Sequence, residues 1–187
     1  VKAAGVNFPD TLIIKDLYQI KPQRPFAPGG EISGVIAAVG ADVNNFSEGD
    51  RVAAIPGFGG FATHVVVPVS HVTKIPDTMS FEDAACFLFT YCTSHYALRD
   101  RAQLEKNETL LITGAAGGVG VAAIEIAKAI GAKVIAAVSS QIKADFCKEI
   151  GADETIIYPK NMDRDSQKAL SGKVKKIVGT SGADVIY

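Results

Sequence analysis

The sequence has 187 residues, of which 48% are hydrophobic, and its formal net charge is -1. This length allows one large or two small domains with buried cores, and the charge argues against a general nucleic-acid binder, because affinity for phosphate backbones needs an excess of lysine and arginine. No apolar run approaches the roughly 20 residues of a membrane-spanning helix, and the three scattered cysteines do not form a disulfide framework, which favours reduced thiols in a cytosolic or organellar protein.

Residues 1–78 predict short strands separated by turns. The candidate strands are residues 31–39, 50–55 and 61–67, and segments rich in Gly, Pro, Asn and Asp lie between them. Short strands with such turns are typical of a compact β-barrel or sandwich. We therefore expect the first part of the chain to be a small β domain.

Helical signals begin at Ser80. A serine followed three residues later by Asp83 is typical of a helix N-terminus, where the hydroxyl caps the first turn. Residues 93–101 predict a further helix. This change of pattern places a domain boundary near residue 90, with one domain at residues 1–90 and a second at residues 91–187.

Residues 109–120 contain the most informative pattern. A buried-strand sequence at 109–113 leads into a glycine-rich turn, and the apolar spacing from Val119 to Ile130 predicts a helix that ends at Gly131. Glycines in such a turn let the backbone approach a pyrophosphate, which the helix N-terminus would bind. The predicted phosphate-binding residues are Ala116, Gly117, Gly118, Val119 and Gly120. Alanine occupies the place of the motif's first glycine, so a glycine turn in a nucleotide-free α/β domain is the alternative.

Two more strands and a helix follow this turn. Residues 133–138 predict a strand, Ile142, Phe146 and Ile150 predict the buried face of an amphipathic helix, and residues 155–158 predict a third strand. The sequence Ile-Gly-Ala ends both helices. Repeated strand–helix units of this kind are typical of a parallel α/β sheet.

Five motifs follow one another along the whole chain, namely AGVNFPD at 4–10, PGGEISGV at 28–35, GDRV at 49–52, GAAGGVG at 114–120 and GAD at 151–153. In this order and spacing they resemble the zinc-free quinone oxidoreductases of the medium-chain dehydrogenase/reductase superfamily. The resemblance implies an α/β protein with a GroES-like β-barrel catalytic domain, a Rossmann domain with a doubly wound parallel sheet, and an active site between them. It also implies that the sequence is a piece of a longer protein, without the first barrel strands and without the Rossmann half beyond a fourth strand at 183–187.

The resemblance also bears on metal binding. It matches Asn7, Gly30 and Phe89 to the positions that hold the catalytic zinc of related alcohol dehydrogenases. Zinc sites use Cys, His or carboxylate ligands, and no cysteine precedes Cys86 to form the structural zinc lobe of those enzymes. We therefore expect no metal, and we expect Glu31 to be a hydrogen-bonded structural acid.

The end of the second Rossmann strand predicts NADPH as the cofactor. NAD-specific sites place Asp or Glu there, whereas this sequence has Val138 followed by Ser139, Ser140 and Lys143. Hydroxyl donors and an ammonium group suit a 2′-phosphate. The alternatives are a helix cap for the serines and a solvated surface charge for Lys143.

Further site residues come from the resemblance alone. Tyr158 would also face the 2′-phosphate, and Thr93 would contact the nicotinamide side of the cofactor. Asn7 and Tyr18 are candidate donors to the acceptor oxygen, whose negative charge grows during hydride transfer, and Asp10 would orient its neighbours. Tyr18 could equally be a half-buried loop aromatic, and the proton could come from Tyr18 or from water.

The expected function is an NADPH-dependent, metal-free reductase of quinones or α,β-unsaturated carbonyl compounds. Enoyl-thioester reduction is the alternative within this class, and a non-enzymatic NADPH-binding relative is the alternative outside it. The expected partner is a small-molecule quinone or enone, with no nucleic acid and no membrane. By resemblance we expect a homodimer in the cytoplasm, with a mitochondrial location left open because the sequence does not begin with Met.

Overall fold

The computed structural model describes residues 1–159, 161 and 163–187. These residues form two compact units, Val1–Phe89 and Thr90–Tyr187. None of the helices in the described ranges has the length and apolar character needed to cross a membrane.

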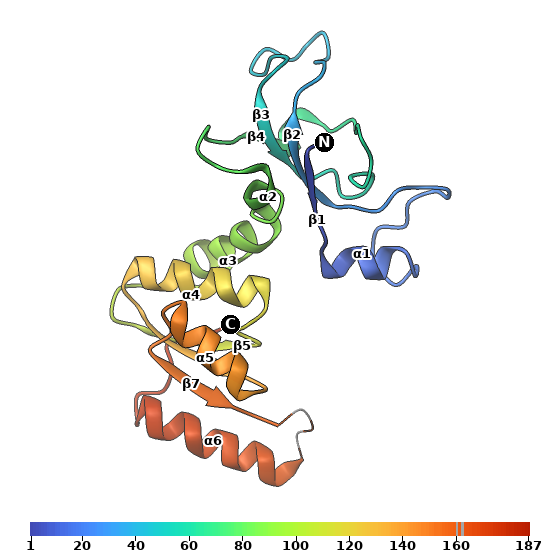
Figure 1. Cartoon of the computed structure of the whole chain (residues 1–187). Helices are drawn as coiled ribbons and strands as arrows, with labels where there is room; N and C mark the ends of the chain where they lie inside the picture. Colours follow the sequence, from blue (N-terminus) through green and yellow to red (C-terminus); the bar gives the residue numbers. More distant parts are fainter. Residues whose placement is uncertain (160, 162) are drawn as a thin grey trace. The chain divides into compact units, whose positions relative to one another are not determined.

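The first unit contains a four-stranded antiparallel sheet in the order β1-β2-β3-β4 (Figure 1). Its strands are β1 (Ala3–Gly5), β2 (Glu31–Val35), β3 (Arg51–Ala54) and β4 (Val72–Lys74). Its helical segments are α1 (Phe8–Ile13), the 3-10 turn η1 (Val69–His71) and α2 (Phe81–Ala84). The predicted strands at 31–39 and 50–55 therefore exist in shorter form.

The strand predicted at 61–67 is wrong. In the described part of the chain this segment joins no sheet, and the side chain of Val66 is 97% exposed. Its backbone hydrogen bonds to other described segments are isolated: Phe61 N–H donates to the Pro28 carbonyl oxygen (2.9 Å), and the amino group of Val1 donates to the Thr63 carbonyl oxygen (2.8 Å). A strand needs a continuous ladder of such bonds, so the β-favouring valines alone do not make one.

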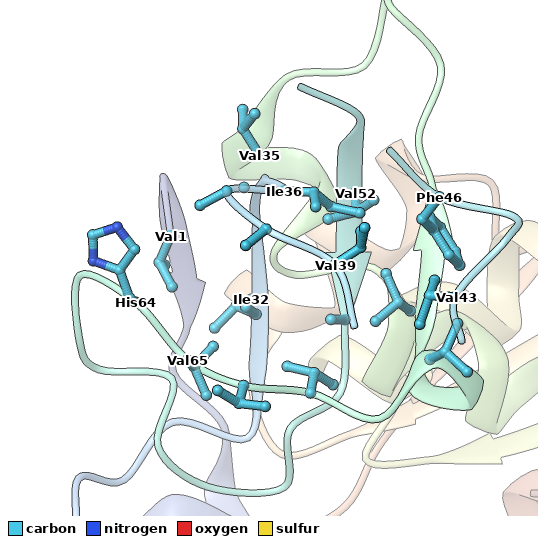
Figure 2. A pocket seen from close by; sticks show the side chains of 18 of the residues that line it. Val1, Ile32, Val35, Ile36, Val39, Val43, Phe46, Val52, His64 and Val65 are labelled. Carbon is cyan, nitrogen blue, oxygen red and sulfur yellow. The ribbon is translucent and has the colours of Figure 1, made fainter. Parts of the chain in front are cut away.

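Residues 64–67 instead border a hollow of about 440 Å³ in the first unit. Figure 2 shows aliphatic side chains of β2 and β3, including Ile32 and Val52, converging on this space with Val39, Val43 and Phe46 from the loop between those strands. The hollow is the apolar side of the sheet, and its lining accounts for the many valines in this half of the sequence.

A run of helical turns follows the first sheet. Ser80 caps α2 as predicted, since its hydroxyl accepts the Asp83 N–H at 3.0 Å. The later segments are η2 (Leu88–Cys92), α3 (Thr93–His95) and η3 (Tyr96–Arg101). Both η2 and η3 are wider π-helical turns. The helix predicted at 93–101 is therefore present, but it is α-helical only over its first three residues. Helical periodicity in sequence does not distinguish these turn types.

The second unit alternates strands and helices around a parallel sheet in the order β7-β6-β5-β8. The strands are β5 (Thr109–Thr113), β6 (Lys133–Val138), β7 (Glu154–Ile157) and β8 (Val185–Ile186). The helices are α4 (Gly118–Ile130), α5 (Gln141–Glu149) and α6 (Arg164–Val178). The predicted strand–helix order and the fourth strand are confirmed.

Side chains alternate across this sheet because successive residues of a strand face opposite sides. Leu110 and Ile112 of β5 pack with Ala123 and Ile124 of α4, whereas Leu111 packs on the other face with residues of α6. The two faces are thus covered by α4 and α5 on one side and by α6 on the other (Figure 1). This is the layered arrangement of a Rossmann sheet.

The predicted buried face of α5 is wrong for Ile142 and Phe146, whereas Ile150 is partly buried against the core as predicted. Ile142 is 82% exposed and Phe146 is 41% exposed, while Ala144 and Cys147 are buried. The same holds at the start of α4, where Val119 is exposed and small residues face the sheet. Small side chains allow a helix to lie close to the strands, so the stripe of the largest apolar residues is a misleading guide here.

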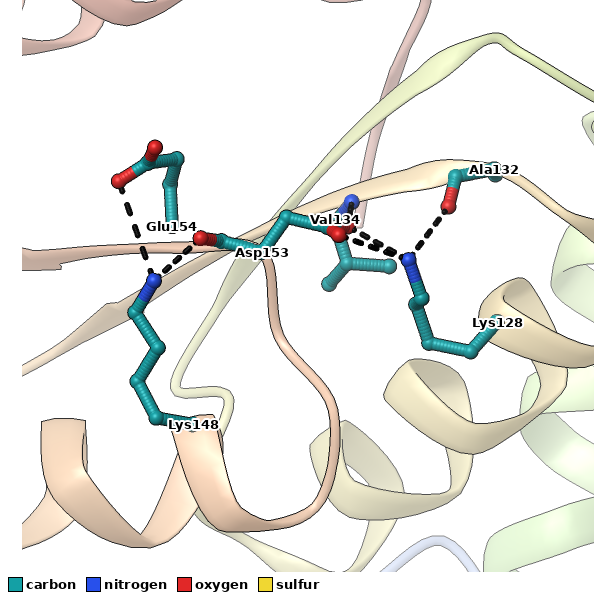
Figure 3. Close-up of polar contacts among 6 residues, drawn as sticks. All are labelled: Lys128, Ala132, Val134, Lys148, Asp153 and Glu154. Carbon is teal, nitrogen blue, oxygen red and sulfur yellow. Dashed lines mark hydrogen bonds and ion pairs between the residues drawn. The ribbon is translucent and has the colours of Figure 1, made fainter.

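The turn between α5 and β7 is held by charged contacts, shown in Figure 3. The ammonium group of Lys128 lies 2.8 Å from each carboxylate oxygen of Asp153, and the Val134 N–H donates to the same carboxylate at 2.7 Å. Partial burial alone would raise the pKa of Asp153, but these hydrogen bonds and the Lys128 charge hold it below its ordinary value. The contact lies at the amino ends of β6 and β7, away from the glycine turn.

Candidate functional site

Two buried carboxylates, those of Asp10 and Glu31, organise a polar corner in the first unit together with Asn7. Asp10 is 4% exposed, and its Oδ1 accepts the N–H groups of Gly29 (3.0 Å) and Gly30 (3.2 Å). Its Oδ2 accepts the N–H of Asn7 at 2.8 Å. Asp10 therefore fixes both the start of α1 and the glycine pair before β2, which is the geometry of an orienting residue.

Glu31 is 0% exposed and binds N–H donors through both oxygens. The Asn7 side-chain amide donates to Oε2 at 3.0 Å, and the Phe89 backbone N–H donates to Oε1 at 2.9 Å. A Cβ added at Gly30 would lie 3.0 Å from the Phe89 ring. Glu31 is therefore a hydrogen-bonded structural acid, as the sequence indicated.

The three positions matched to zinc ligands thus surround one carboxylate. Asn7, Gly30 and Phe89 supply an amide, a bare backbone and a phenyl ring, none of which is a zinc ligand in proteins. Across the described residues, no three His, Cys, Asp or Glu side chains gather closely enough to hold a metal ion. The donor set at this corner suits hydrogen bonding to a ligand oxygen.

Tyr18 lies in the loop after α1 and is half-buried. Among the described residues its hydroxyl has no hydrogen-bond partner, and the hydrogen-bond partners of Asn7 are Asp10 and Glu31. No hydrogen bond therefore joins the two candidate donors in the described part of the chain, and the role of Tyr18 stays a prediction.

The glycine turn, residues 114–120 of the second unit, has the form expected for close approach of a ligand. Gly114 has φ of 63°, in the left-handed region that favours glycine. A Cβ at Gly120 would lie 2.5 Å from the Ala115 carbonyl oxygen, so only glycine fits where α4 meets the turn. Gly117 and Gly118 are exposed, and the first amides of α4 have no partner within the helix.

The remaining residues of the turn differ in exposure. Val119 is exposed, Ala116 is half-buried and Gly120 is buried. Ala115, at the place of the motif's first glycine, is fully buried, and its N–H donates to Ala137 of β6 at 3.3 Å. A methyl group is therefore accommodated there, on the core side of the turn.

The serine–lysine edge consists of Ser139, Ser140, Lys143 and Tyr158. The Ser140 hydroxyl caps α5 by accepting the Lys143 N–H at 3.4 Å, and the Lys143 ammonium group lies 3.4 Å from the Ser139 hydroxyl. The Tyr158 N–H donates to Val138 at 2.9 Å. All four lie at the carboxyl ends of β6 and β7, beside the turn that follows β5, because these strands are parallel neighbours. Ligands bind at this edge of doubly wound sheets.

Thr93 is exposed at the start of α3. The next residue, Ser94, is 0% exposed, and its hydroxyl donates to the Val119 carbonyl oxygen at 2.8 Å. The Tyr187 hydroxyl lies 3.3 Å from the same serine. Sequence reasoning missed Ser94 because its partners are 25 and 93 residues away and no local motif signals them.

A second contact joins the same helical segment to α4. The Tyr91 hydroxyl donates to the Glu125 carboxylate, and this hydrogen bond, with partial burial and the nearby negative charge, raises the pKa of Tyr91 to about 12. A Cβ at Gly118 would lie 3.0 Å from the Thr90 methyl group. The segment that carries Thr93 is therefore tightly packed on the helix that begins at the glycine turn.

Two family models match the chain in order. Residues 1–77 match the alcohol dehydrogenase GroES-like domain, and residues 118–187 match the model described as zinc-binding dehydrogenase. The chain is also similar to quinone oxidoreductase-like protein 2 of Rattus norvegicus, with 39% identity over 186 residues that cover 99% of the chain and 51% of the relative.

The chain is also similar to solved structures of a quinone oxidoreductase and an enoyl reductase. The quinone oxidoreductase of Escherichia coli complexed with NADPH is 34% identical, with a TM-score of 0.88 over 100% of this chain and 55% of that one. The CurK enoyl reductase is 30% identical, with a TM-score of 0.85 over 98% of this chain and 55% of that one. The chain therefore spans about half the length of these relatives.

Proposed function

Because the chain belongs to the quinone oxidoreductases of the medium-chain dehydrogenase/reductase superfamily, we propose that it is part of an NADPH-dependent, metal-free reductase of quinones or α,β-unsaturated carbonyl compounds. The proposal assigns the cofactor to the glycine turn and the serine–lysine edge of the second unit. It assigns the acceptor oxygen to the polar corner of the first unit.

The observation that carries the cofactor assignment is the chemistry at the end of β6. Ser139 and Lys143 present a hydroxyl and an ammonium group 3.4 Å apart. They follow Val138, which occupies the position where NAD-specific sites have a carboxylate. These donors suit a 2′-phosphate. The exposed Gly118, whose amide lies in the first turn of α4, suits a pyrophosphate. The E. coli quinone oxidoreductase, which is 34% identical to this chain, was solved with NADPH.

When bound, NADPH supplies a hydride to the acceptor. The chain's contribution at the polar corner is a donor for the acceptor oxygen. The half-buried Asn7 amide uses one N–H on Glu31 and keeps a second N–H for a ligand. A preorganised donor of this kind lowers the barrier when negative charge grows on the oxygen. Asp10 holds Asn7 and the Gly29–Gly30 turn in place, and Tyr18 remains the second candidate donor.

Metal-free chemistry follows from the same donor set. The positions of the zinc ligands hold Asn7, Gly30 and Phe89, and both oxygens of Glu31 accept N–H groups. Metal analysis of the purified protein should find no stoichiometric zinc. One tightly bound zinc per chain would contradict this part of the proposal.

Enoyl-thioester reduction is the second candidate function, and the likeness to the CurK enoyl reductase favours it. The deciding experiment is NADPH oxidation by the full-length protein with quinones, simple enones and enoyl thioesters as acceptors. Turnover with quinones or enones at a kcat/KM above that of enoyl thioesters supports the proposal, and the reverse order supports the second candidate. Tight NADPH binding without turnover of any acceptor would indicate a non-enzymatic relative.

The homodimer expected from the resemblance also remains a prediction. Sedimentation equilibrium of the full-length protein tests this prediction, because the molar mass measured for a dimer is twice that of one chain. A monomer across a wide range of protein concentration would contradict it.

A further inference from the structure

We propose that Glu31 is a positioning residue that sets which end of the Asn7 amide faces the acceptor. The inference rests on the proposed function, since it concerns the donor for the acceptor oxygen. Glu31 is 0% exposed and so does not touch a substrate, whereas the half-buried Asn7 is the donor that the proposed function assigns to the acceptor oxygen. Glu31 therefore acts through Asn7.

The orientation follows from hydrogen-bond chemistry. A carboxylate offers only acceptors, whereas an asparagine amide has a donor end and an acceptor end. Glu31 Oε2 lies 3.0 Å from the Asn7 amide nitrogen. The opposite orientation would place the Asn7 carbonyl oxygen against the carboxylate, with two acceptors facing each other and no proton between them. Glu31 thus selects the orientation in which the nitrogen is inward and its second N–H is left for a ligand.

Glu31 itself has little freedom to move. Its Oε1 accepts the Phe89 backbone N–H at 2.9 Å, and a Cβ added at Gly5 would lie 3.1 Å from its Oε2. The sheet register also fixes its backbone, because Glu31 pairs with Gly5 between β1 and β2. The carboxylate is therefore a fixed reference for the Asn7 amide.

Replacement of Glu31 by glutamine distinguishes the orientation of the Asn7 amide from a role in packing alone. Glutamine has the same shape but only one acceptor oxygen. The Phe89 N–H belongs to the backbone and cannot turn, so the Gln oxygen should remain on it and the Gln amide nitrogen should face Asn7. Asn7 then rotates its amide to present oxygen to that nitrogen. The Glu31→Gln variant keeps the hydrogen bonds to Phe89 and Asn7. However, the Asn7 carbonyl oxygen now lies where the Asn7 amide nitrogen was, so the ligand meets an acceptor in place of a donor.

The test is a double-mutant cycle in the full-length protein, with kcat and NADPH affinity measured for wild type, Glu31→Gln, Asn7→Ala and the double variant. We expect Glu31→Gln and Asn7→Ala each to lower kcat on the order of 100-fold, the effect of losing one oxyanion donor, with unchanged NADPH affinity. In the Asn7→Ala background, Glu31→Gln should cause no further loss, because both changes remove the same donor.

Side-chain amide NMR gives a readout that does not depend on activity. The Asn7 NH₂ signals, identified by their absence in Asn7→Ala, should show one proton protected from exchange in wild type and lose that protection in Glu31→Gln. Full kcat in Glu31→Gln, additive losses in the cycle, or unchanged protection would overturn the inference. Absence of NADPH oxidation in wild type with every acceptor would instead contradict the proposed function, and the NMR result would still decide the orientation of Asn7.

Discussion

The hydroxyl of Ser94 donates a hydrogen bond of 2.8 Å to the carbonyl oxygen of Val119. Val119 lies between two glycines in the first turn of α4, so this bond ties the helical segment before β5 to the turn proposed to bind pyrophosphate. The Tyr187 hydroxyl, 3.3 Å from Ser94, adds the end of β8 to the same group. Three segments far apart in the sequence thus meet at one buried hydroxyl.

Ser94→Ala should weaken NADPH and NADH binding by the same factor. The lost hydrogen bond contributes roughly 1 kcal/mol, or about fivefold in affinity, and it supports the pyrophosphate turn that both cofactors use. Fluorescence titration with each cofactor measures the effect. Ser171→Ala on the exposed side of α6 is the matched control and should change neither affinity. A loss confined to NADPH would contradict the assignment of Ser94 to the pyrophosphate turn.

Gly120→Ala and Gly117→Ala should separate folding from cofactor binding. A methyl group at Gly120 would meet the Ala115 carbonyl oxygen at 2.5 Å, so the turn must shift and the apoprotein should lose roughly 1–3 kcal/mol of stability. At Gly117 the nearest atom is 3.5 Å away and the site is exposed, so the apoprotein should stay as stable as wild type. Its methyl group would instead obstruct the phosphates.

Thermal unfolding without cofactor and NADPH titration measure the two effects. We expect Gly120→Ala to lower Tm, and Gly117→Ala to leave Tm unchanged while weakening NADPH binding at least tenfold. Unchanged NADPH affinity in a fully folded Gly117→Ala variant would contradict the proposed phosphate site.

The sequence predicts the second unit well because its signals are local. β6 lies at the predicted residues, β5 and α4 begin and end within one residue of them, and Gly131 ends α4 with φ of 92°. Strand hydrophobicity, glycine turns and helix ends are all decided by neighbours in the chain. The serine–lysine edge also follows, since parallel strands bring their carboxyl ends together.

The features that the sequence does not predict depend on distant partners. Val66 has the β-branched side chain of a strand residue, yet no neighbouring strand pairs with its segment in the described structure. Ile142 has a helical spacing to Phe146, yet α5 turns Ala144 and Cys147 to the sheet because they fit closely. The bond from Phe89 to Glu31 spans 58 residues. Such contacts are set by packing, on which local propensity has little influence.

Lys143→Ala should abolish the preference for NADPH. Wild type should bind NADPH at least tenfold more tightly than NADH, about 1.4 kcal/mol, and the variant should bind both equally, with NADH affinity unchanged. The preference in wild type should also fall with added salt, because Lys143 is exposed. Lys148→Ala on the same helix is the matched control, since its ammonium group bonds to the Asp153 carbonyl oxygen instead. Equal affinity of wild type for both cofactors would contradict the cofactor assignment.

Asp153→Asn should lower stability at neutral pH but not in acid. The amide keeps an oxygen for the Val134 N–H, but it removes the charge beside Lys128 and puts an NH₂ group in place of the other oxygen, which lies 2.8 Å from the Lys128 ammonium group. Because the folded-state pKa of Asp153 lies below its ordinary value of 3.8, folding favours the ionised carboxylate. The stabilisation is complete above the unfolded-state pKa and is lost as the pH falls through the lower folded-state pKa.

Urea unfolding of wild type and Asp153→Asn at neutral pH and near pH 3 measures this change. The pair is about one-third exposed, so the difference at neutral pH should be no more than about 1 kcal/mol, and it should shrink in acid and in high salt. Glu154→Gln is the control, because its carboxylate lies 3.9 Å from the half-exposed Lys148 and should contribute little. A difference between wild type and Asp153→Asn that stays constant from neutral pH to pH 3 would show that the ion pair with Lys128 is not its source.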